Sequence, residues 1–391
     1  MNRLTQRRAV RVVACLAIGA LALTACGKSK TSTSSSDKPT YTIAYQGPLS
    51  GDNAQLGINE DNSVKLAIDE ANKKGDLPFT LKYVFSDDEG SPDKSPAAGQ
   101  KLIDDPNVMA VIGPAFSGAT AAIEAKFTEA NLVSVSPSAT RADLTSLGFK
   151  TFYRVLQTDA VQGPALANYV SKGLSAKSVY VVDDKSAYGA GLSKFVTDQL
   201  KTNGTAFKSE GVAVTKDYSA TATKISTSGA DVVVYAGYYA EFALFTKAVK
   251  SAGFKGAIIS GDGSKDGEYV KQAGASAEGV YLTCPCGDAN SDPKAATFAA
   301  AYKAFNAGAE PSTYSAEAYD ATNAVIAAMK SVGKTLTRAT VADAVKTIDY
   351  MGITKEIKFE ANGEVGGEAI YLYQVKSGKI AVLGLIKDLI K

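Results

Sequence analysis

Short runs of apolar and β-branched residues alternate with longer amphipathic stretches, and this alternation constrains the fold more than any other feature. The amphipathic stretch 57–74 shows the helical pattern, because Val64, Ile68 and Ala71 fall on one face and Gly75 follows as a stop signal. Strands that alternate with helices form parallel sheets with helices on both faces. The strands expected from this pattern are 42–45, 79–86, 108–112, 179–182, 232–235 and 257–259.

A break near 157–162 divides the alternation into two runs. Residues from about 295 to 346 then read as almost wholly helical. Three further strands are expected near 357–359, 370–375 and 380–383. We therefore predict an α/β protein with two doubly wound parallel-sheet lobes. The late helices would complete the first lobe and the last strands the second, so the chain must cross between the lobes several times.

The first 25 residues have the features of an export signal. Four arginines and no acidic residue precede an apolar run from Val12 to Leu23, which is too short for a permanent membrane span. The run ends in Leu23-Thr24-Ala25-Cys26, which resembles the lipobox of bacterial lipoproteins. We predict a signal peptide over 1–25, a lipid on Cys26, and a flexible Ser/Thr/Lys-rich tether over 26–40. A plain secretory signal is the alternative.

The charge balance and the lack of histidine narrow the function. The formal net charge is +2, and removal of the four signal arginines leaves −2 with no basic block, so nucleic-acid binding is not indicated. Because the chain contains no histidine, it cannot form a Ser-His-Asp triad, a Cys-His pair or an HExxH zinc site. A carboxylate enzyme such as a glycosidase remains the alternative. Two cysteines, Cys284 and Cys286, would on their own bind a metal ion only weakly. The sequence allows either a disulfide between them or two free thiols.

The loops that follow the predicted strands are the candidate ligand site, because ligands of open α/β sheets bind beyond the carboxyl ends of strands. Ser117 lies between a predicted strand and a predicted helix. Its hydroxyl could bind an anion or could cap the N-terminus of that helix. Ser138 and Thr140 follow the next strand. Asp262 lies between glycines and could meet a cation or occupy a turn. None of these loops carries a nucleotide-binding or nucleophile-elbow motif.

Four motifs, in order along the chain, carry a family resemblance. They are Pro48-Leu49-Ser50-Gly51 with Ala54 and Gly57, the run 136–169 with Arg154, Asp159 and Gln162-Gly163, Tyr188-Gly189-Ala190-Gly191, and Ala318-Tyr319-Asp320-Ala321. Over Tyr41–Lys391 the chain resembles the Leu/Ile/Val-type (branched-chain amino acid) substrate-binding lipoproteins of ABC transporters. These are type I periplasmic binding proteins, whose two lobes are joined by a three-crossover hinge.

The resemblance implies which residues hold the two charged ends of an amino acid. Ser117, Ser138 and Thr140 correspond to residues of the first lobe that hold the α-carboxylate. Tyr238 and Asp262 correspond to residues of the second lobe that hold the α-ammonium. Asp262 stands where some relatives have Glu, which implies a deeper ammonium or a bridging water.

The remaining implied site residues enclose the ligand. Tyr188 would close over it, and the side-chain pocket would be shaped by Leu56, Ala115, Phe116 and Tyr314. Leu56 replaces an aromatic residue that is often found there, which implies a wider or differently shaped pocket.

The same resemblance implies hinge crossovers near 157–159, 284–287 and 362–366. The first lobe would then comprise 41–157 with 286–363, and the second 158–285 with 364–391. Cys284 and Cys286 fall near a crossover and would stiffen it if they pair.

Together these features predict a monomeric binding protein without cofactor, metal or enzymatic activity. It would be anchored by lipid to the outer face of the cytoplasmic membrane, capture a branched-chain or other aliphatic amino acid between closing lobes, and deliver it to a membrane permease. An amide, urea or aromatic-acid ligand, or a sensor role, is the alternative. Without histidine to titrate, binding should vary little between about pH 6 and 8.

Overall fold

The computed structural model describes residues 38–390, so the predicted signal peptide, Cys26 and most of the tether lie outside the described residues. Its first sheet has five parallel strands in the order β2-β1-β3-β4-β5. The strands are β1 (Thr40–Gly47), β2 (Thr80–Asp87), β3 (Val108–Ile112), β4 (Val133–Ser136) and β5 (Phe152–Arg154). This sheet and the helices that pack on it are called lobe I below.

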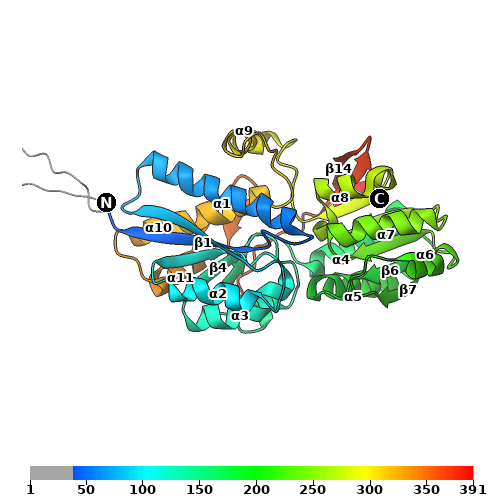
Figure 1. Ribbon diagram of the computed structural model, residues 1–391, viewed down its shortest axis with the longest axis horizontal. Helices are drawn as coiled ribbons and strands as arrows, with labels where there is room; N and C mark the ends of the chain where they lie inside the picture. The colour runs from blue at the N-terminus through cyan, green and yellow to red at the C-terminus, as the bar shows by residue number, and fades with distance from the viewer. Residues whose placement is uncertain (1–37, 391) are drawn as a thin grey trace, which may run out of the picture. The chain divides into compact units, whose positions relative to one another are not determined.

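Helices cover both faces of the lobe I sheet, as alternation of strand and helix predicts (Figure 1). Ile43 and Ile112 point to one face, where they share a core with α1 (Ala54–Lys74), α10 (Ser315–Val332) and α11 (Arg338–Lys346). Ala44 and Val111 point to the other, against α2 (Ser95–Asp104) and α3 (Ser117–Glu129). The late helical block therefore completes the first lobe, as expected. Helix α9 (Ala296–Phe305) packs on the outer side of α1.

The second sheet has seven strands in the order β14-β13-β10-β9-β8-β6-β7. The strands are β6 (Ser178–Asp183), β7 (Ala206–Gly211), β8 (Val232–Ala236), β9 (Ala257–Ser260), β10 (Tyr281–Cys284), β13 (Tyr371–Lys376) and β14 (Lys379–Leu385). Strands β6 to β10 are parallel, whereas β13 and β14 form an antiparallel hairpin at one edge. The last strands therefore complete this sheet, and they make it mixed rather than wholly parallel. This sheet and its helices are called lobe II.

Lobe II also has a core on each face of its sheet. Tyr235 and Val233 pack against α6 (Ser219–Ser226), α7 (Tyr239–Ser251) and α8 (Gly267–Ala273). Val232 and Val234 pack against α4 (Asp159–Asn168), α5 (Ala187–Thr202) and α12 (Ile386–Leu389).

The chain passes between the two lobes three times. The first passage joins β5 to α4, the second follows β10, and the third joins β12 (Glu356–Lys358), which pairs with β11 (Asp349–Met351) in a small hairpin, to β13. Cys284 and Cys286 form a disulfide at the second passage, which decides the question left open by the sequence.

Within 38–390 no helix is both long and apolar enough to cross a membrane.

Candidate functional site

One cavity between the lobes collects nine of the ten residues expected to bind a ligand. Four elements of lobe I and three segments of lobe II contribute to its wall. The lining residues are Leu56, Ala115, Phe116, Ser117, Ser138, Tyr188, Tyr238, Asp262 and Tyr314, together with Gly263. The tenth residue, Thr140, is fully buried but does not line the cavity. The cavity volume is about 10 Å³, room for roughly one water molecule, so an amino acid requires the walls to move apart.

Asp262 is the acidic centre of this cavity and is 2% exposed. Its Oδ1 accepts hydrogen bonds from the Tyr188 hydroxyl at 2.7 Å and from the Gln162 amide. Its Oδ2 accepts one from the Tyr314 hydroxyl, which comes from lobe I. Burial raises the pKa of Asp262, and the three donors act against this rise because they favour the ionised carboxylate. The site thus holds a buried negative charge that is stabilised by hydrogen bonds.

A second buried carboxyl, Asp159, lies beside the first. It opens α4, its backbone N–H donates to the Thr140 carbonyl at 2.9 Å, and neither of its carboxyl oxygens has a hydrogen-bond partner of good geometry. Burial raises the pKa of Asp159 well above its ordinary value, and the charge of Asp262 raises it further. Asp262 has three donors, whereas the Thr140 hydroxyl is the group that favours an ionised Asp159, so a negative charge is better stabilised on Asp262 than on Asp159.

Tyr314 reaches Asp262 through a strained backbone. It precedes α10 with φ 67°, a left-handed conformation that is rare for a bulky residue and costs of order 1–3 kcal/mol. This backbone conformation places the Tyr314 hydroxyl of lobe I within hydrogen-bond distance of the Asp262 carboxylate of lobe II. The resemblance assigned Tyr314 to the side-chain pocket, whereas the structure also gives its hydroxyl a contact with the acid.

The glycines beside Asp262 make room for aromatic rings. A Cβ atom at Gly261 would lie 2.6 Å from the Tyr188 hydroxyl oxygen, and one at Gly263 would lie 2.8 Å from the Tyr188 ring. The Gly263 N–H also donates to the Tyr188 hydroxyl at 3.1 Å. Tyr188 is therefore held against Asp262 within its own lobe.

The hydroxyl groups of lobe I differ in how freely they can meet an anion. Ser117 begins α3, but its oxygen does not cap that helix and instead accepts from the Arg141 N–H at 3.2 Å, which leaves its proton available. The Ser138 hydroxyl donates to the Ala115 carbonyl at 2.8 Å and would have to turn to reach a ligand. The Thr140 hydroxyl has no hydrogen-bond partner among the described residues. A carboxylate here would also meet the free amides of the α3 N-terminus.

Aromatic rings from the two lobes meet at the apolar wall of the cavity. Phe116 of lobe I stacks on Tyr238 of lobe II with ring centroids 4.2 Å apart and planes inclined by 13°. Gly90, with φ +69°, lies under the Phe116 ring at a position where any side chain would collide with it. Leu56 and Ala115 add aliphatic surface. The cavity therefore offers a charged end, a hydroxyl-lined end and an apolar wall.

Direct hydrogen bonds between the lobes surround the cavity, and the sequence did not indicate them. Asn59 of α1 donates to Asp266 at 2.9 Å, and Asn53 donates to Glu241 at 3.0 Å. Gln162 was noted only as part of a motif, although it contacts Asp262 directly. Amide side chains on helices look like ordinary surface residues in a sequence, so no local pattern marks these roles.

Residues 38–390 contain no cluster of side chains that is typical of a metal site. No group of three or more Cys, Asp or Glu side chains is arranged to hold a metal ion in this part of the chain. Asp262, the carboxylate that lines the cavity, accepts its hydrogen bonds from two tyrosines and one amide.

Comparison with known proteins agrees with this geometry. Residues 40–379 match the family of periplasmic binding proteins. The chain belongs to that family. Its members are extracytoplasmic binding proteins and not a family of enzymes.

Relatives of this periplasmic binding protein are similar over nearly the whole chain. The Leu/Ile/Val-binding protein homolog 3 of Brucella melitensis is 30% identical over 88% of this chain and 93% of its own. The branched-chain amino acid transporter substrate-binding protein LivJ of Streptococcus pneumoniae, solved in complex with isoleucine, is 30% identical and superposes with a TM-score of 0.80 over 88% of this chain and 99% of its own. The leucine-binding protein LivK of Thermotoga maritima gives a TM-score of 0.81 at 27% identity, over 88% and 98%.

Proposed function

We propose that this periplasmic binding protein captures a small aliphatic amino acid between its lobes and delivers it to the membrane permease of an ABC importer. The observation that carries the proposal is the placement of Asp262, a buried carboxylate with three hydrogen-bond donors, in one cavity with the anion-binding end of α3. The relatives named for binding branched-chain amino acids support the choice of ligand class.

Each end of a zwitterion finds a matching group in this arrangement. The α-ammonium pairs with Asp262, which is the one acid among residues 38–390 that lines the cavity. The α-carboxylate takes hydrogen bonds from Ser117, Ser138 or Thr140 and from the amides of α3. The aliphatic side chain rests on Leu56, Ala115 and Phe116, where burial of a branched side chain contributes about 1.5–3 kcal/mol. Neutral amides or urea would leave the Asp262 charge without a cationic partner.

Lobe motion is part of the proposed mechanism. The Phe116–Tyr238 stack and the Tyr314–Asp262 hydrogen bond both span the cavity, so they must part before a ligand enters. Closure around the ligand then restores contacts between the lobes and creates the surface that the permease recognises. We propose that the protein acts as a monomer, tethered to the outer face of the cytoplasmic membrane by a lipid on Cys26.

Calorimetric titration of the standard amino acids against the purified protein tests the proposal. Leucine, isoleucine or valine should bind with one ligand per chain, and acidic or basic amino acids should bind at least tenfold more weakly. Urea, acetamide and benzoate belong in the same screen because proteins of this architecture could hold them as alternatives. Binding of one of these without binding of any amino acid would overturn the proposal.

A further inference from the structure

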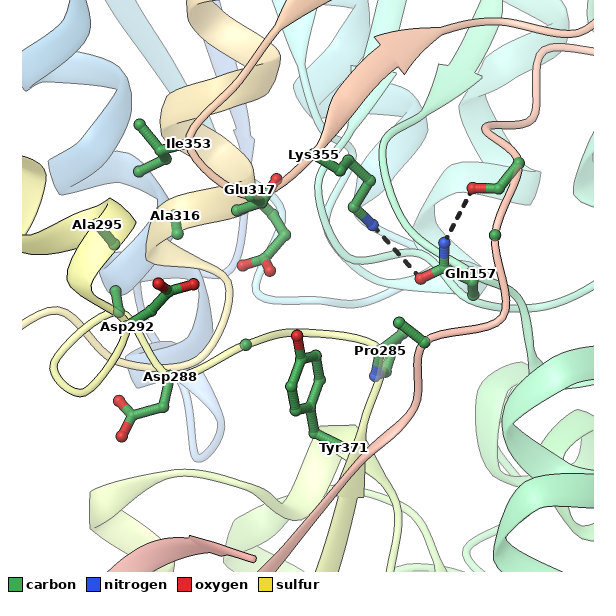
Figure 2. A pocket seen from close by; sticks show the side chains of 16 residues that line it. Gln157, Pro285, Asp288, Asp292, Ala295, Ala316, Glu317, Ile353, Lys355 and Tyr371 are labelled. Atoms are coloured by element: carbon green, nitrogen blue, oxygen red, sulfur yellow. Dashed lines mark hydrogen bonds between the residues drawn. The ribbon is translucent and has the colours of Figure 1, made fainter. Parts of the chain in front are cut away.

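A second, larger cavity lies at the hinge. Its volume is about 170 Å³, and all three passages between the lobes contribute to its wall (Figure 2). Gln157 comes from the first passage, Pro285 and Gly287 from the second, and Gly366 from the third. The remaining wall includes Glu317 of α10 and Lys355, neither of which lines the cavity around Asp262.

Glu317 and Lys355 carry opposite charges into this cavity without pairing with each other. Glu317 is 2% exposed, and its carboxylate projects into the space shown in Figure 2. Within residues 38–390 it accepts no hydrogen bond from another side chain and forms no ion pair. Within the described residues the Lys355 ammonium donates one side-chain hydrogen bond, a long one of 3.4 Å to the Gln157 amide oxygen.

Charges in such a site are costly when no hydrogen-bonded partner of opposite sign offsets the water they have lost. Glu317 and Lys355 attract each other across the cavity, which lowers the pKa of Glu317 and raises that of Lys355, but they form no hydrogen bond with each other. Burial raises the pKa of Glu317 to about 7 and lowers that of Lys355. The two other acids of the wall are already engaged: Asp288 accepts from the Asn290 N–H at 3.1 Å, and Asp292 accepts from the Lys294 N–H at 2.9 Å. Glu317 and Lys355 are thus the two groups that a ligand can satisfy.

We propose that the hinge cavity is a second ligand site, which binds a small zwitterion with its ammonium on Glu317 and its carboxylate on Lys355. A molecule with both charges satisfies both residues at once, whereas an anion or a cation alone leaves one of them unpaired. The hydroxyl of Tyr371, which also lines the cavity, offers a further hydrogen bond.

A ligand in this cavity would bias the hinge. Gln157 accepts from Lys355 and donates to the Gly366 carbonyl at 3.2 Å, so the two hydrogen bonds connect the ligand-binding lysine to the first and third passages (Figure 2). The cavity has this form while the lobes are in contact, so its ligand favours that state. By thermodynamic linkage, the ligand of the hinge cavity and the ligand of the cavity around Asp262 must each strengthen the binding of the other by the same factor.

Calorimetry with ω-amino acids of increasing length tests the site. Glycine, β-alanine, γ-aminobutyrate and 5-aminovalerate place the two charges at increasing separation. At least one of them should bind in the millimolar range or tighter, and methylammonium and acetate should each bind at least tenfold more weakly. Failure of all four to bind at millimolar concentration would overturn the proposal.

Substitutions then distinguish the hinge cavity from the cavity between the lobes. Glu317→Gln and Lys355→Met should each weaken binding of the ω-amino acid at least tenfold, while Asp262→Asn, which lies outside this cavity, should weaken it less than either hinge variant does. Glu129→Gln and Lys126→Met, both exposed on α3, are matched controls. Thermal unfolding checks that each variant folds. Loss of binding in Asp262→Asn but not in either hinge variant would assign the ligand to the first cavity and refute the second site, independently of which amino acid the first cavity prefers.

Discussion

Asn59 of lobe I donates its side-chain amide to the Asp266 carboxylate of lobe II at 2.9 Å, and so joins the lobes beside the cavity without contacting it. The same Asp266 oxygen accepts from the Ser312 hydroxyl at 3.1 Å, also from lobe I. Asp266 is buried and additionally accepts from the Glu268 N–H as the N-cap of α8. The closed arrangement is thus stabilised in part by contacts between the lobes themselves.

We expect Asn59→Ala to weaken amino-acid binding by roughly ten- to a hundredfold, since one hydrogen bond to a charged group contributes about 1.5–3 kcal/mol after solvent exchange. The loss should appear as faster dissociation, because the contact forms on closure. Stopped-flow measurement of both rates checks this.

Asn62→Ala is the matched control for this prediction. Asn62 lies one turn further along α1, and its amide donates to the Tyr302 hydroxyl at 3.4 Å within lobe I. It should leave both rate constants nearly unchanged. Equal effects of the two substitutions would show that α1 is merely destabilised and that the lobe contact has no separate role.

Asp262→Asn should weaken binding of the preferred amino acid by about 2–5 kcal/mol, since it removes one partner of a buried charge pair. In the parent protein, affinity should fall as the pH is lowered, because burial raises the pKa of Asp262 and the ammonium binds only its ionised form. Calorimetry from pH 5 to 8 measures both effects. Asp198→Asn, exposed on α5, is the control, and a loss below about threefold in Asp262→Asn would place the ammonium elsewhere.

The absence of histidine does not by itself make binding independent of pH, because buried carboxyls can replace histidine as groups that titrate near neutrality. Burial raises the pKa of Glu317 to about 7 and the pKa of Asp88 and Asp184 to about 6. Depth of burial decides these values, and a sequence does not record how deeply an acid on a helix or in a loop after a strand is buried.

The parts of the fold that have strong hydrophobic runs were predictable from the sequence. The expected strand 108–112 matches β3 residue for residue, because each of its side chains is buried. Strand β7 was missed, since it forms an exposed edge in which only Phe207 and Glu210 are partly buried. The antiparallel hairpin of β13 and β14 was expected as two strands, but their direction depends on pairing with β10, which local pattern does not encode.

The residues that line the cavity were expected from two sources, the loops that follow strands and the family motifs. Tyr314 and Asp262 are 52 positions apart and belong to different lobes, so their hydrogen bond could not be derived from spacing. The chain brings them together only after it has crossed the hinge. Residues whose role depends on the closed arrangement, such as Asn59, had no signal in the sequence.

The Cys284–Cys286 disulfide should stabilise the protein only slightly, because it closes a very short loop. Loop-closure entropy for three residues corresponds to about 1–2 kcal/mol. A variant with both cysteines replaced by serine should lose no more than this in the free energy of unfolding, measured by urea titration, and should still bind ligand. Alkylation of the intact protein before and after reduction, followed by mass spectrometry, checks that the pair is oxidised.

Cys26→Ala should release the protein from the membrane fraction, because Cys26 directly follows Leu23-Thr24-Ala25 and precedes a polar tether. Fractionation and immunoblotting measure the distribution, and mass spectrometry of the N-terminus reports the lipid. Cys15→Ala, inside the predicted signal peptide, is the control and should stay membrane-bound. Unchanged membrane association of Cys26→Ala with normal processing would contradict lipidation at this residue.

Glu124 provides a test of how burial controls stability against pH. It is fully buried in α3, its Oε1 accepts from the Ser134 hydroxyl at 2.8 Å, and its Oε2 has no hydrogen-bond partner among the described residues. Burial raises the pKa of Glu124 to about 8. The folded protein therefore holds a proton that the unfolded chain releases near its ordinary pKa of about 4.3.

Stability should consequently fall as the pH rises from about 5 to 8, since the unfolded chain loses this proton long before the folded protein does. The contribution of Glu124 is fully present below its unfolded pKa and is lost as the pH approaches 8. Glu124→Gln keeps the shape and removes the titration, so the difference in the free energy of unfolding between pH 5 and pH 8 should shrink by up to several kcal/mol. Urea titrations at both pH values measure this, with Glu129→Gln, an exposed neighbour on α3, as the control. If both variants keep the parent's pH dependence, Glu124 is already ionised in the folded protein, and an unseen partner must be stabilising its charge.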